Sequence, residues 1–162
     1  MTLDYHANEY GRWEHDENGL PCFRLTAEDD LAPYAPLKHL MATGRLSAFA
    51  DRWGNVALFT TDGGTGYVDI TRNAHQCRSA LYSMVRVGGR LVSLIHGELA
   101  DDRSVRYRTG GAEYSGELHD RGVDLRVEQA FAAPPENTPF VLGRFRITNL
   151  GEQALDAEWI VA

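Results

Sequence analysis

The sequence has little of what several protein classes require. Its two cysteines, Cys22 and Cys77, are too few for the disulfide scaffold of a small secreted protein. Basic residues are outnumbered, with 16 Lys and Arg against 23 Asp and Glu and a formal net charge of −7. Proteins that bind nucleic acid or an anionic membrane surface need a basic face, so both partners are disfavoured.

Long apolar stretches and leader-like segments are also missing. No run approaches the roughly 20 apolar residues that a membrane-spanning helix needs. Residues 1–10 are polar and acidic, without the basic and apolar regions of a secretory signal. We therefore expect a cytoplasmic protein whose two cysteines are reduced thiols.

Helical periodicity is scarce. Residues 31–44 hold the one modest helical pattern, in which Leu37, Leu40 and Met41 share a face and Gly44 ends the segment. Two prolines limit this helix to a turn or two. Because long helices between strands are lacking, a parallel α/β sheet is disfavoured.

Strand and turn signals, in contrast, are abundant. Apolar and polar residues alternate in short runs, and turns such as Asn18-Gly19 and Gly88-Gly89 recur about every ten residues. The expected strands lie within 10–25 and over 46–50, 56–60, 67–70, 80–87, 90–96, 105–108, 113–120, 123–128, 141–148 and 154–161. We expect the last two to pair with each other around residues 149–152.

This pattern predicts an all-β fold, a two-sheet antiparallel β-sandwich with one buried face per sheet. With 162 residues and a 43% apolar share, the chain suits one domain. Because it ends inside the last expected strand, we expect residues 1–162 to be a single β-sandwich domain or the larger part of one, truncated from a longer protein.

Familiar catalytic and metal-binding motifs are weak. Residues 61–66 are glycine-rich, yet strand-like residues follow them instead of the helix that a phosphate-binding loop needs. His75 and Cys77 lack the closely spaced cysteine pair of a structural zinc site. The early carboxylates are more typical of a solvated face than of a catalytic pair; they are Glu14, Asp16, Glu17, Glu28, Asp29 and Asp30.

Aromatic residues offer a different chemistry, because their rings stack on the apolar faces of sugars. We expect Trp159, in the last strand, to belong to the core. Trp53 and Tyr67 adjoin turns, so we expect them to be more exposed.

Three stretches resemble one known family. They are residues 13–19, residues 54–67, and residues 122–134 continued by 145–149 and 158–159. In this order they resemble the amino-terminal domain of the cellobiose phosphorylase family, which includes chitobiose phosphorylase. The resemblance covers most of the chain loosely and implies a large, galactose-mutarotase-like β-sandwich, often called a supersandwich.

The resemblance also implies a function. In that family the sandwich precedes a catalytic α/α-barrel, in which an aspartate acts as general acid and inorganic phosphate attacks the sugar with inversion. Nothing here corresponds to that barrel. We therefore expect a non-catalytic domain, without a cofactor of its own, that supports homodimerisation and frames an oligosaccharide site of a downstream helical domain; inorganic phosphate is the parent enzyme's co-substrate.

The family's Gly-Gly-Gly-Tyr segment lies near its active site, and here Thr65 interrupts the glycines. Two arginines follow where the family is often basic. The residues expected near carbohydrate are Gly63, Gly64, Gly66, Tyr67, Trp53, Arg72 and Arg78.

Two alternatives remain open. The first is a free-standing carbohydrate-binding or mutarotase-like sandwich, which needs a positioned acid and base. His96 with Glu98, or His119 with Glu117, satisfies the spacing because residues i and i+2 share a strand face. The second is a structural dimerisation module.

Overall fold

The structure, a computed structural model, describes residues 7–8, 10–25, 38–60, 83–93, 101–134 and 136–161. All regular secondary structure in these ranges is β-strand, and every strand pairing is antiparallel. The all-β antiparallel fold expected from the alternation is therefore confirmed.

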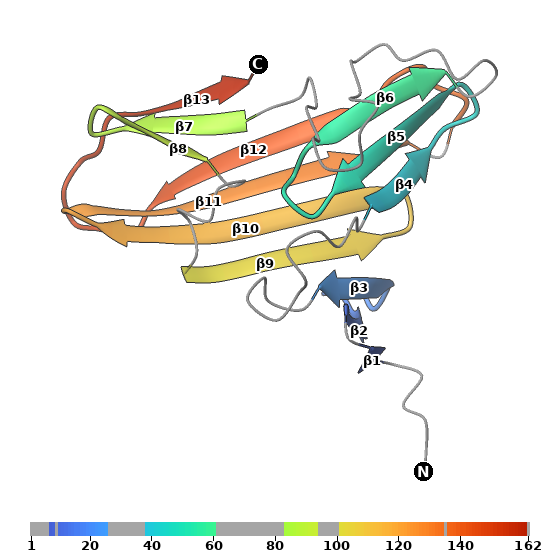
Figure 1. Ribbon diagram of the computed structural model, residues 1–162, viewed down its shortest axis with the longest axis horizontal. Helices are drawn as coiled ribbons and strands as arrows, with labels where there is room; N and C mark the ends of the chain where they lie inside the picture. Colours follow the sequence, from blue (N-terminus) through green and yellow to red (C-terminus); the bar gives the residue numbers. More distant parts are fainter. Residues whose placement is uncertain are drawn as a thin grey trace.

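One large sheet forms the base of the molecule. Its order is β1 (Ala7–Asn8), β2 (Gly11–His15), β3 (Pro21–Leu25), β9 (Asp101–Arg108), β10 (Gly111–Asp120), β11 (Val123–Ala132) and β12 (Leu142–Asn149). The long strands β9–β12 run side by side along the molecule (Figure 1).

Two small sheets form the second layer. One has the order β13 (Ala157–Val161), β7 (Ser83–Val87) and β8 (Arg90–Ser93), and the other has the order β4 (Lys38–Ala42), β5 (Leu46–Asp51) and β6 (Val56–Thr60). They lie over opposite ends of the long strands (Figure 1). The arrangement is a sandwich whose second layer is split in two.

The tight turns lie at glycines that the sequence predicts as turn residues. Gly88 and Gly89 both have positive φ, 55° and 73°, which is the backbone that joins two strands with matching twist. Arg121 and Gly122 adopt the same left-handed region at 52° and 80°, although arginine is rarely found there. Both hairpins, β7–β8 and β10–β11, follow from these turns.

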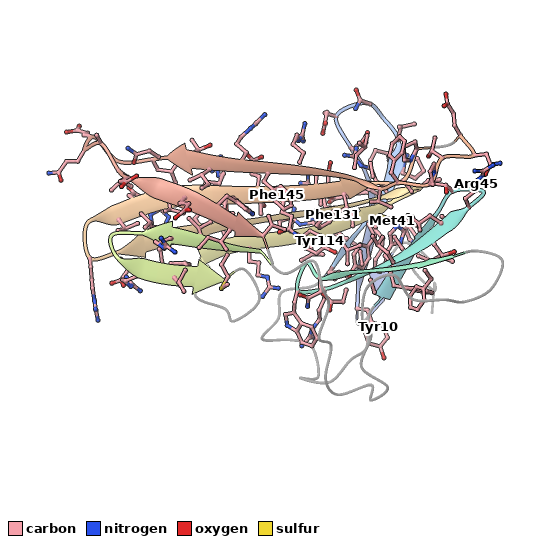
Figure 2. All side chains as sticks on the ribbon, turned by 90° about the horizontal axis from the view of Figure 1, so that it is seen from above. Tyr10, Met41, Arg45, Tyr114, Phe131 and Phe145 are labelled. Carbon is pink, nitrogen blue, oxygen red and sulfur yellow. The ribbon has the colours of Figure 1, made fainter. Side chains whose placement is uncertain are left out.

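The described residues form two core clusters, one between each small sheet and the large sheet. The cluster between β4–β6 and the large sheet includes Met41, Tyr107, Tyr114 and Phe131, with Phe145 packed against them. Figure 2 shows Met41, Tyr114, Phe131 and Phe145 in the layer between the sheets. The second cluster lies between the sheet of β7, β8 and β13 and the large sheet, and its buried residues are Val85, Val87, Val92, Leu118, Val123, Leu125 and Val127.

The helix expected within residues 31–44 is wrong where the structure describes it, because residues 38–42 form strand β4. Met41 is fully buried, whereas its neighbour Leu40 is 52% exposed. In a helix, consecutive residues would lie on adjoining parts of one face, but in a strand they point to opposite faces. Pairing with β5 decides the conformation, since Leu40 faces Phe49 and Met41 faces Ala48 across the ladder.

The expected pairing of the last two strands is also wrong. β12 pairs with β11 in the large sheet, and β13 pairs with β7 in the other layer. The connection crosses between layers, and Asn149 Nδ2 donates to the carbonyl of Gln153 at 2.7 Å within it. The strands meet face to face instead, with the rings of Phe145 and Trp159 4.9 Å apart. Trp159 packs against the second cluster, as expected for a core residue.

Candidate functional site

The outward face of the large sheet carries charged side chains in rows. Because strands alternate, the residues facing away from the core on β2, β3 and β9 include Arg12, Arg24 and Arg106, which lie directly opposite one another. Across β10–β12 the same row continues with Glu113, Ala130 and Arg144. Like charges opposite one another destabilise a sheet, so this row suggests a purpose other than stability.

A β-bulge interrupts β9 beside these rows. Ser104 lies opposite Ser115, but the next matched pair is Asp101 with Glu117, so β9 has one residue more than β10 here. Asp102 lies within the bulge and has a positive φ of 52°. Bulges of this kind re-aim side chains and often lie next to binding sites.

A basin of about 310 Å³ opens on this face. Small side chains at Ser104, Ser115 and Ala130 leave it hollow, because their neighbours on the same face are long. Its charged lining residues are Arg24, Arg106, Arg144, Arg146, Glu17, Asp102, Glu113 and Glu128. The basin therefore offers guanidinium donors, carboxylate acceptors and serine hydroxyls within one hollow.

Some of these charges are already paired. Arg106 Nε lies 3.1 Å from Glu14 Oε1, and Arg146 Nη1 lies 3.5 Å from Glu128 Oε2. Glu113 forms an ion pair with Arg108. Arg24 and Arg144, in contrast, form no ion pair with any residue that the structure describes, so their guanidinium groups are available to a ligand from opposite sides of the basin.

The acidic opening hairpin has mainly a structural role. Asp16 Oδ1 accepts hydrogen bonds from the backbone amides of Asn18 and Leu20, both at 2.9 Å, and Asp16 Oδ2 accepts one from Nη1 of the Arg108 side chain at 3.2 Å. The hydrogen bond from Leu20 is the main reason that the pKa of Asp16 is lowered. Asp16 thus stabilises the turn that presents Glu17 to the basin.

The same face carries the histidine–glutamate pair whose spacing suggested acid–base chemistry. His119 Nε2 lies 3.0 Å from Glu117 Oε2, and His119 Nδ1 lies 2.5 Å from Asp124 Oδ1. The hydrogen bond to Glu117 raises the pKa of His119, while Arg126, which donates to Glu117 from Nε at 2.7 Å, lowers the pKa of Glu117. Each group thus favours the charged form of the other, and Arg126 and Asp124 add to this effect.

Trp53 lies on the other side of the large sheet. It belongs to the turn between β5 and β6, to which Tyr114 donates at the carbonyl of Asp51 and Gln129 at the carbonyl of Gly54, each at 2.6 Å. Trp53 itself is half-buried beneath the Arg52 guanidinium, 4.5 Å from its ring centroid. The structure therefore does not bring Trp53 to the basin.

The remaining expected site residues, Gly63, Gly64, Gly66, Tyr67, Arg72 and Arg78, lie outside the described residues, as do His75, Cys77 and the pair His96 and Glu98. Cys22 is described: it is a buried, free thiol whose pKa is raised by burial. Trp13 is the most exposed described tryptophan, at 53%, and its ring meets Phe23 edge-on on the core-facing side of β2 and β3.

The basin was missed from the sequence, although part of its signal is there. Apart from Leu142, the outward-facing residues of β9–β12 are polar or small. What the sequence does not contain is the register that sets Ser104 opposite Ser115 and Ala130 opposite Arg144. The hollow exists only because these small residues become neighbours.

Fold and site together define a class: an all-β, two-layer antiparallel domain with a polar basin on the solvent face of its larger sheet. No family model, curated protein or solved structure matches the chain. Within the part of the chain that the structure describes, no helix has the length and apolar character needed to cross a membrane.

Proposed function

We propose that this chain is a non-catalytic, carbohydrate-associated domain and that its basin binds part of an oligosaccharide. The observation that carries the proposal is the alternation of arginines and carboxylates around a floor of serines and alanine. Each sugar hydroxyl both donates and accepts a hydrogen bond, so it is best bound where donors and acceptors adjoin. Arg24 and Arg144 would donate, and Glu17 and Asp102 would accept.

The size of the basin supports a small part of a glycan. Its volume of about 310 Å³ is at the lower end of the range for ligand pockets, which suits roughly one or two sugar rings. Its wall is charged rather than aromatic, so binding would depend on hydrogen bonds more than on stacking. Such sites favour specificity through geometry over high affinity.

The resemblance to the cellobiose phosphorylase family supports the wider setting of this proposal. In that setting the parent enzyme cleaves β-linked oligosaccharides with inorganic phosphate and inversion, using a downstream helical domain. The sandwich would frame the active site and support a homodimer. The glycine-rich segment, with Tyr67, Arg72 and Arg78, would then lie near carbohydrate.

The mutarotase-like alternative rests on His119 and Glu117, which do lie within hydrogen-bond distance. A general acid and base must be able to exchange protons with the sugar. Here Asp124 contacts the second ring nitrogen, and Arg126 contacts Glu117, so both are engaged. An ion cluster is the better reading, and polarimetry on α-glucose decides: accelerated mutarotation that is lost in His119→Gln would restore the alternative.

The proposed binding is tested by filling the basin. Ala130→Phe places a large ring on the floor, whereas Ala132→Phe is a matched control on the same strand and face that does not line the basin. We expect β-linked glucose oligosaccharides to bind the wild type and Ala132→Phe alike, and Ala130→Phe about tenfold more weakly or not at all. The measurement is an NMR titration, in which shifts should concentrate at Ser104 and Ser115.

Equal binding by both variants would contradict the proposal. Trp13→Ala adds a second control, because Trp13 is an exposed aromatic ring on the opposite face. If the loss follows Trp13→Ala instead, the sugar stacks on that ring and the basin is not the site.

A further inference from the structure

Strand β12 is a long open edge of the large sheet. It pairs with β11 on one side, and no strand in the described ranges pairs with it on the other. β12 has eight residues, whereas the edge strands β4, β6 and β13 have five each and β8 has four. Six of its residues are exposed, and Phe145 and Ile147 are half-buried.

Within the described ranges, charged side chains are the one kind of edge protection that β12 has. Natural sheets protect long edges with charged side chains, proline, a bulge or a covering element. β12 contains no proline, and its register with β11 runs unbroken from Leu142 to Asn149. Its backbone is thus a regular template for one more strand.

The side chains of β12 specify what that strand must be. Arg144 and Arg146 face outward and Phe145 and Ile147 face the core, so an added strand needs carboxylates on one face and apolar residues on the other. Arg144 has no ion-pair partner among the described residues, and Arg146 has only the exposed contact with Glu128 at 3.5 Å. Exposed apolar side chains at Phe140 (46%) and Leu142 (57%) extend the surface.

A second copy of the chain fits this edge poorly. If two β12 strands paired antiparallel with their sheet faces continuous, the registers with most overlap would set Arg144 against Arg146, or Arg146 against itself. Like charges directly opposite each other are destabilising. The edge therefore disfavours self-pairing and favours an acidic partner.

We infer that β12 is the acceptor edge for an extended segment of another polypeptide, in which acidic and apolar residues alternate. The segment adds as a strand, its backbone bonding to β12. Its carboxylates pair with Arg144 and Arg146, and its apolar residues extend the row of Phe145 and Ile147.

The test uses capped ten-residue peptides that alternate glutamate with valine, or lysine with valine. We expect the glutamate peptide to bind and to slow amide hydrogen exchange in residues 142–149, and the lysine peptide to bind about tenfold more weakly. In Arg144→Glu/Arg146→Glu the preference should reverse. The matched control Arg45→Glu/Arg121→Glu changes two exposed arginines that do not belong to β12 and should leave the preference unchanged.

Other outcomes overturn the inference. These are equal binding of both peptides, protection elsewhere than β12, or dimerisation through β12 in sedimentation. Asp102→Asn, on β9, separates this edge from the basin: it should weaken sugar binding and leave peptide binding intact. Failure of sugar binding in the wild type would contradict the proposed function without touching this one.

Discussion

Arg121 illustrates how single residues depart from the backbone rules of this fold. Its side-chain contacts with the described residues do not explain its left-handed φ of 52°. The ion pair with Asp120 is 3.8 Å long, and the side chain is 80% exposed. The conformation is set by the tight turn between β10 and β11, which needs two such residues in succession.

Replacing Arg121 by glycine should therefore stabilise the protein. Relief of the left-handed backbone outweighs the entropy that glycine loses, so we expect the free energy of unfolding to rise by about 0.5 kcal/mol. Gly122→Ala, at φ 80° with nothing near the new Cβ, should lower it by about 1 kcal/mol. Urea unfolding measures both, and changes of the same sign would contradict this account.

His119 gives the outward face a pH dependence. Its pKa is raised by Glu117 and Asp124, so its contribution to stability is complete below its ordinary value of 6.5 and is lost as pH rises through the raised pKa. The pKa of Glu117 is lowered, chiefly by Arg126, so its contribution is present above 4.5 and is lost as pH falls through the lowered pKa.

We therefore expect the stability difference between wild type and His119→Gln to be largest between pH 4.5 and 6.5 and to shrink at higher pH. Thermal unfolding of both proteins across pH measures this, and the subtraction cancels the other histidines. A difference that grows with rising pH would show that the ring is neutral in the folded protein.

At the scale of elements, β4 shows where local pattern and tertiary pairing conflict. Leu40 and Met41 satisfy a helical face as readily as two strand faces, and only the ladder with β5 separates them. Met41→Ala should lower the free energy of unfolding by about 2–5 kcal/mol, because it opens a cavity in the first cluster. Leu40→Ala should change it by less than about 1 kcal/mol.

Chemical denaturation of the two variants distinguishes strand from helix. In a short amphipathic helix the two residues would share one buried face, so their truncations would have similar effects. Similar losses would therefore contradict the strand. A large loss at Met41 alone would confirm that alternate residues of β4 face opposite ways.

Other strands could be predicted from the sequence. Strands β7, β8, β10 and β11 follow from turns whose glycines permit positive φ, and from alternation that holds over the long strands. The pairing of β12 with β13 was wrong because adjacency in the chain is only a tendency, and burial of Trp159 against the second cluster placed β13 in the opposite layer. The basin needed both register and bulge, neither of which the composition of one strand encodes.

At the scale of the molecule, each small sheet covers its own half of the large one. Among the described strands, only β10 and β11 contribute buried apolar residues to both clusters: Tyr114 and Phe131 to the first, Leu118 and Leu125 to the second. Their mutual register is unbroken over ten residue pairs.

The split second layer has a consequence for how the fold holds together. We expect each small sheet to unfold locally without exposing the other cluster, so a destabilising change in one cluster should have a local effect. Among the described strands, the β10–β11 hairpin contributes buried residues to both clusters, so we expect it to be the main element that couples them into one cooperative unit. Backbone amide hydrogen exchange should be slowest along this hairpin, because its residues are buried in both clusters.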